Sequence, residues 1–106
     1  MTEDPTDTPL TLARFQQHIR DRYHATDHAR GTPGTFMWFI EEVGELATAL
    51  HKASGHGGDT SGGENLEEEF ADVLAWLCTL ANINGVNLTR AVQKKYLSGG
   101  GPAGHK

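Results

Sequence analysis

The chain has 106 residues and a formal net charge of -5 at pH 7, which fits one domain with a modest core and argues against a nucleic-acid polymer as partner. Its single cysteine excludes an intrachain disulfide. The polar, acidic N-terminus and the lack of a long apolar run give no sign of a signal peptide or a membrane partner, and predict a cytoplasmic protein.

The first predicted helix follows a flexible tail at residues 1–10, which is rich in Thr, Asp and Pro. Thr11 is a suitable N-cap, and apolar residues then recur every three or four positions until about Thr26. Residues 27–34 contain two glycines and a proline, so they are predicted to form a loop.

A second helix is expected to begin with Thr35 as its cap. Glu42 and Glu45 lie on the border of its apolar face. Gly44 within this helix costs about 1 kcal/mol relative to alanine, so we expect close approach of another backbone to compensate. The glycine-rich residues 55–63 are predicted to form a helix–helix connection or a mobile lid.

A third helix is expected to begin at Asn65, with Glu68 completing a capping box, and to end at Gly85 as its C-cap. This helix is apolar nearly all round, which in so small a chain indicates a partner subunit. Asn87 can cap a short last helix. Residues 98–106 are predicted to be a flexible tail, so the helical domain spans 11–97.

Two pairs of carboxylates stand three residues apart, Glu42 with Glu45 and Glu69 with Asp72. Residues at this spacing share a helix face, so two antiparallel helices can bring all four acids together. Like charges about 5 Å apart repel by roughly 3 kcal/mol at an effective dielectric near 20, so such a cluster requires cations. Oxygen ligands of this kind suit magnesium. From the residues alone, a metal site and a solvated acidic face remain open alternatives.

The strings that carry these acids are GTFMWFIEEVGEL at residues 34–46 and LEEEFADVLAW at residues 66–76. They resemble the MazG family of nucleoside triphosphate pyrophosphohydrolases, whose signature is Glu-x-x-Glu, a variable gap and Glu-x-x-Asp. The likeness extends from about Leu12 to Tyr96. It implies an all-α, four-helix MazG-like bundle completed by oligomerisation, as a homodimer or homotetramer. It also implies Mg²⁺, with Mn²⁺ as a substitute, and cleavage of nucleoside triphosphates to the monophosphate and pyrophosphate in a house-cleaning role.

Carried over residue by residue, the resemblance implies a set of metal ligands, namely Glu42, Glu45, Glu69 and Asp72. Glu41 matches an acid that binds a further metal or orients the attacking water, which makes Glu41 and Glu42 catalytic candidates. Lys95 resembles a family lysine expected near the phosphates, where it would serve both catalysis and substrate binding.

Two tryptophans are candidates for contact with the base. Trp76 lies one turn after Asp72, where related enzymes place an aromatic ring, and its alternative is a subunit interface. The alternative for Trp38 is core packing. Arg30 and Lys52 are interpreted as surface charges, and the alternative is that they steady phosphate oxygens.

Two other functions stay open. One is phosphoribosyl-ATP pyrophosphohydrolase, which the Trp- and Gly-containing context of the first acidic motif fits less well. The other is a non-enzymatic helical module for oligomerisation or regulation, whose acids only solvate a surface. The sequence does not identify the base.

Overall fold

A computed structural model of the chain describes residues 9–55 and 62–99. Helix α1 spans Leu12–Ala53, α2 spans Gly62–Ile83, and α3 spans Leu88–Val92 and continues into a π-helical turn, η3, at Gln93–Leu97. No strand occurs within these ranges, so the predicted all-α class is confirmed. The predicted tails and the glycine-rich connection lie almost wholly outside the described residues.

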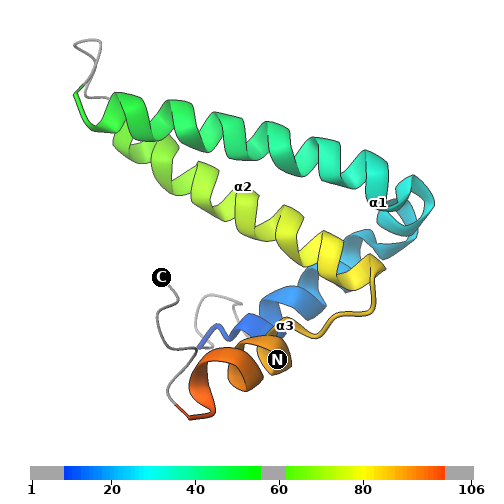
Figure 1. Ribbon diagram of the computed structural model, residues 1–106. Helices are drawn as coiled ribbons and strands as arrows, with labels where there is room; N and C mark the ends of the chain where they lie inside the picture. The colour runs from blue at the N-terminus through cyan, green and yellow to red at the C-terminus, as the bar shows by residue number, and fades with distance from the viewer. Residues whose placement is uncertain (1–8, 56–61, 100–106) are drawn as a thin grey trace, which may run out of the picture.

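The chain is arranged around a sharp bend in α1 (Figure 1). After the bend, α1 runs antiparallel to α2. The part of α1 before the bend lies near the C-terminal end of α2. The bend is at Gly31, whose backbone has φ 78° and ψ 175°. That region is essentially restricted to glycine, so Gly31 permits a change of direction within one residue. Pro33 then lies near the start of the second helical part, where a missing N–H does little harm.

The predicted loop at residues 27–34 contains the observed break at Gly31 but is too long, because the helix continues through Arg30. The reason is a pairing within one helical turn: Arg30 Nη2 lies 3.1 Å from Asp27 Oδ1. Thr35 does not cap a helix. It lies inside α1, fully buried, and its hydroxyl accepts a hydrogen bond from Arg30 Nη1 at 3.3 Å.

Other predicted helix ends met mixed outcomes. Thr11 and Asn87 are N-caps, accepting from backbone N–H groups three residues later at 3.1 and 3.0 Å. Gly85 ends α2 with φ 69°, and Val86 N–H donates to the carbonyl of Ala81, the pattern of a Schellman cap. The predicted cap at Asn65 is wrong, because α2 begins earlier, at Gly62.

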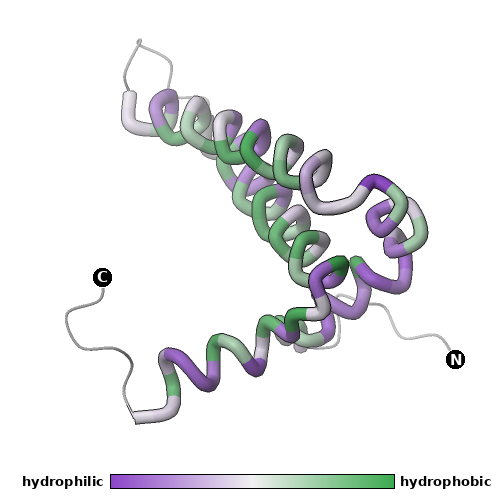
Figure 2. Tube along the Cα trace, turned by 45° about the vertical axis from the view of Figure 1, so that its right-hand side comes forward, coloured by the Kyte–Doolittle hydropathy of each residue, from purple (hydrophilic) through white to green (hydrophobic). Residues whose placement is uncertain are grey.

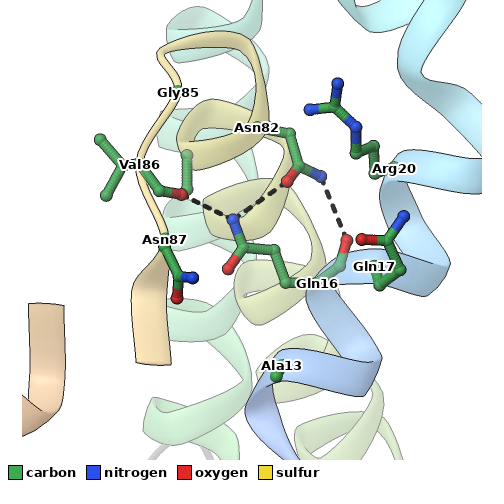
Figure 3. A pocket seen from close by; sticks show the side chains of 9 residues that line it. Ala13, Gln16, Gln17, Arg20, Asn82, Gly85, Val86 and Asn87 are labelled. Carbon is green, nitrogen blue, oxygen red and sulfur yellow. Dashed lines mark hydrogen bonds between the residues drawn. The ribbon is translucent and has the colours of Figure 1, made fainter. Parts of the chain in front are cut away.

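The junction of α1, α2 and α3 is held by the amide of Gln16 (Figure 3). Its Nε2 donates to Asn82 Oδ1 at 3.0 Å and to the Val86 carbonyl at 2.7 Å, and its Oε1 accepts from Leu88 N–H at 3.0 Å. One side chain thus positions the start of α1 against both the end of α2 and the start of α3. A polar pocket of about 360 Å³ opens beside it, with Arg20 on its rim.

The described part of the chain has a small apolar core, made by Ile19, Ala49, Cys78 and Ala81. Hydrophobic residues also run along α2 and the facing part of α1 (Figure 2), but many of them stay exposed. The exposed set on these two helices includes Phe36, Ile40, Val43, Leu50, Phe70, Leu74 and Leu77. An alanine Cβ at Gly44 would meet no atom within 4 Å, so close approach of another backbone within this chain is not what Gly44 provides.

Candidate functional site

Three carboxylates meet between the second part of α1 and α2. One oxygen each from Glu42, Glu69 and Asp72 can be chosen so that all three lie within 4.8 Å of one another. Glu69 is only 8 % exposed, Glu42 is half-buried, and Asp72 is open to solvent. The cluster is therefore a partly enclosed set of oxygens at the boundary between the helix pair and water.

The electrostatics of this cluster are unfavourable without a cation. Burial, together with the neighbouring acids Glu45, Asp72 and Glu69, raises the pKa of Glu42. Burial and the carboxylates of Glu45 and Asp72 likewise raise the pKa of Glu69. Oε2 of Glu42 and Oε2 of Glu69 are both buried and have no hydrogen-bond partner. Buried acceptors without donors, converging from two helices, fit the oxygen coordination of a hard divalent cation.

The two remaining predicted acids lie at the margin. Glu45 is exposed and outside the three-oxygen cluster, yet it is close enough to raise the pKa values of Glu42 and Glu69. Glu41 is exposed, lies outside the three-oxygen cluster and is not among the acids that raise the pKa values of Glu42 and Glu69. The structure thus brings together three of the four proposed ligands, with Glu45 beside them.

A pocket of about 340 Å³ lies one turn further along α2 from Asp72. Ala75, Trp76 and Thr79 of α2 form one wall, and Ile19, Tyr23, Asp27 and Arg30 of α1 form the other. Trp38 stacks on Trp76, with ring centroids 6.1 Å apart and 13° between the planes. Trp38 is 48 % exposed, so it is not a core residue within one chain. Both predicted aromatic residues therefore gather beside the acids.

A polar network behind this pocket was missed by the sequence analysis. Asp27 is 4 % exposed, and its Oδ2 accepts from the hydroxyl of Thr79 at 3.1 Å. Its Oδ1 pairs with Arg30, whose guanidinium carbon lies 5.0 Å from the centre of the Trp76 ring. Arg30 is thus not a plain surface charge. The available signal was the spacing of Asp27 and Arg30 on one helix face, immediately before a glycine.

The structure does not bring Lys95 to the acids. This residue lies on η3, which extends beyond α3 and away from the α1–α2 pair (Figure 1). Its side chain is exposed, and its Nζ lies 5.6 Å from the centre of the Tyr96 ring. A role for Lys95 at the phosphates therefore needs more than one isolated chain.

Within the described residues, no helix combines the length and the apolar character needed to cross a membrane.

Comparison with known proteins places this geometry in a family. No curated protein matches the sequence. The family model described as the MazG nucleotide pyrophosphohydrolase domain matches residues 32–96, which is more than half of the chain and includes all four predicted ligands. By this match and by its all-helical fold, the chain belongs to the MazG nucleotide pyrophosphohydrolase family.

Proposed function

We propose that the protein is a nucleoside triphosphate pyrophosphohydrolase that depends on a divalent cation and cleaves between the α and β phosphates. The products are the nucleoside monophosphate and pyrophosphate. The observation that carries the proposal is the cluster of three carboxylate oxygens within 4.8 Å, one turn from a pocket walled by tryptophan. That arrangement offers a cation site for the phosphates and an aromatic wall for the base. A house-cleaning role, in which unwanted nucleotides are removed, is consistent with this activity.

Glu42, Glu69 and Asp72, together with Glu45, would hold Mg²⁺ or, as a substitute, Mn²⁺. A bound cation of this type offsets the charge on phosphate oxygens and on a leaving pyrophosphate. The chain itself contributes a fixed set of carboxylate oxygens on two packed helices. Two of these oxygens, Glu42 Oε2 and Glu69 Oε2, are buried and have no hydrogen-bond partner. Glu41 is exposed beside Glu42 and can accept the proton of the attacking water.

The nucleobase is proposed to enter the pocket beside Trp76 and Trp38. Because Trp76 lies one helical turn after Asp72, a nucleotide with its phosphates at the acids would direct its base along α2 toward this pocket. The stacked pair offers a flat apolar surface, which suits an aromatic base.

The active form is proposed to be a homodimer or homotetramer. Exposed apolar side chains on both α1 and α2 leave one face of the helix pair uncovered, and a second copy would complete a four-helix bundle. The position of Lys95 supports the same conclusion, because its helix is remote from the acids of its own chain. Lys95 is expected to reach phosphates across a subunit interface. Light scattering after size-exclusion chromatography measures the subunit number directly.

A substrate panel tests the activity. The protein is incubated with the common and damaged (d)NTPs and with phosphoribosyl-ATP, with Mg²⁺ or with EDTA, and released pyrophosphate is measured. We expect release from at least one nucleoside triphosphate with Mg²⁺ and none with EDTA. Glu42→Gln with Asp72→Asn should abolish release, whereas Glu67→Gln, an exposed acid outside the cluster, should retain it. No release from any nucleotide, with no detectable Mg²⁺ binding, would overturn the proposal.

A further inference from the structure

In the pocket beside Trp76, hydrogen-bond donors remain available while most acceptors already have partners. Asp27 is almost fully buried, and each of its carboxylate oxygens already accepts one hydrogen bond, from Arg30 and from Thr79. Thr79 is 5 % exposed, and its hydroxyl donates its hydrogen bond to Asp27. Tyr23, also in the lining, carries a hydroxyl that can donate or accept. The remaining polar groups in the lining are the Arg30 guanidinium and the indole N–H of Trp76, and both are donors only.

Arg30 is held in a fixed place by its neighbours. Nη2 donates to Asp27 Oδ1 at 3.1 Å and Nη1 donates to Thr35 Oγ1 at 3.3 Å. The stem of its side chain lies against Gly34, since an alanine Cβ at that position would be 3.1 Å from Arg30 Cγ. The orientation is therefore set before any ligand binds, which lowers the entropy cost of recognition.

The guanidinium keeps free donors for a ligand. Arginine has five N–H donors, and two of them are used by Asp27 and Thr35 among the described residues, which leaves three. The side chain of Arg30 is 24 % exposed, and it lines the pocket beside the Trp76 ring. A base that enters this pocket thus meets a positively charged group that can donate two parallel hydrogen bonds.

We propose that Arg30 is a specificity-determining residue that selects 6-oxopurines such as guanine and hypoxanthine, whose O6 and N7 are adjacent hydrogen-bond acceptors. This inference rests on the proposed function and names its substrate class. An arginine fork matches O6 and N7 of guanine, the commonest specific contact between arginine and a base. Adenine presents an amino donor in place of O6, which would face the donors of Arg30. Asp27 acts through Arg30 as a positioning residue.

Steady-state kinetics on three substrates test the proposal. We expect kcat/KM to be about 10- to 100-fold higher for dGTP than for dATP, the range that one bidentate pair supplies. The value for 7-deaza-dGTP, which lacks the N7 acceptor, should fall between them. Arg30→Lys keeps the charge but loses the fork, so it should reduce the ratio of dGTP to dATP toward one. A purely structural defect would lower both rates together. Arg20→Lys, on the same helix but in the other pocket, should keep the wild-type ratio.

A binding measurement separates failure of the inference from failure of the proposed function. Of the two tryptophans of the chain, Trp76 lines this pocket and Trp38 stacks on Trp76, so tryptophan fluorescence reports the occupancy of the pocket. The wild-type protein with Mg²⁺ is titrated with dGMP, 7-deaza-dGMP and dAMP, which require no turnover. Tightest binding of dGMP, reduced in Arg30→Lys, supports the inference whatever the pyrophosphate assay gives. Equal binding of dGMP and dAMP, or no binding of dGMP, would overturn it even if triphosphates are cleaved.

Discussion

Replacing Glu42 by glutamine is expected to stabilise the cation-free protein. A carboxylate oxygen of Glu42 lies within 4.8 Å of one from Asp72. Two unit charges at this distance repel by about 3.5 kcal/mol at an effective dielectric near 20, and by under about 1 kcal/mol in bulk water. Because Glu42 is only half-buried, solvent screening moves the net effect toward the lower figure. We expect a gain of about 1 kcal/mol in the free energy of unfolding at neutral pH.

The gain should depend on pH with a definite sign. Burial and the neighbouring acids raise the pKa of Glu42 in the folded chain above its ordinary value of 4.5. In the window above pH 4.5 the folded state therefore binds more protons than the unfolded state, and stability falls as pH rises. Glutamine does not titrate. The difference between Glu42→Gln and wild type should be small at pH 4.5 and reach its full value at pH 8.

Thermal unfolding followed by circular dichroism measures this difference, in EDTA and at one protein concentration. A change of about 1 kcal/mol shifts the Tm of a domain of 60–100 residues by roughly 4–8 °C. Adding 10 mM Mg²⁺ should raise the Tm of wild type and leave that of Glu42→Gln unchanged. The matched control is Glu67→Gln on α2, which should melt near wild type. If Glu42→Gln melts no higher than this control at pH 8, or if Mg²⁺ stabilises both equally, the acids do not form a strained cation site.

Four further substitutions test the fold and its assembly. Asp27→Asn should cost about 2 kcal/mol in urea denaturation, because Arg30 loses its counter-charge while half-buried; an unchanged midpoint would count against the network. Gly31→Ala should cost about 1–3 kcal/mol in the same assay, since φ 78° strains any L residue, whereas Gly44→Ala in open helix should add up to about 1 kcal/mol. A loss at Gly44 would instead show that another subunit closes on it. Leu74→Glu on the exposed face should lower the subunit number in light scattering while helicity is kept; an unchanged mass would exclude this face as the interface.

Features that depend on a few neighbouring residues were predictable from the sequence. The caps at Thr11 and Asn87 are hydrogen bonds between residues three apart, and the end of α2 follows from the freedom of Gly85 to adopt positive φ. Spacing between near neighbours also explains why the acids of each pair lie on one helix face. Glu69 and Asp72 share a face because of helical spacing alone, and the long second and third helical segments already suggested that they would meet the first acidic pair.

The structure around the break in α1 also involves contacts between distant segments. Glycine and proline in residues 27–34 predicted a loop, yet the helix continues through Arg30. Asp27 pairs with Arg30 within one turn and is also buried against Thr79, a residue 52 positions away. Asp27 also holds Arg30 in the wall of the pocket, and the spacing of these two residues does not show which distant residues complete that pocket.

The sequence by itself therefore determined the helical class, the helix ends at Thr11, Gly85 and Asn87, and the pairing of carboxylates along each helix, since these depend on periodicity and on hydrogen bonds spanning only a few residues. Only the tertiary structure decided which side chains line the pocket and that η3, the element that carries Lys95, lies away from the α1–α2 pair. The physical reason is that burial of a polar side chain is favourable only when a distant segment supplies its partner, and the sequence does not show which segment that is.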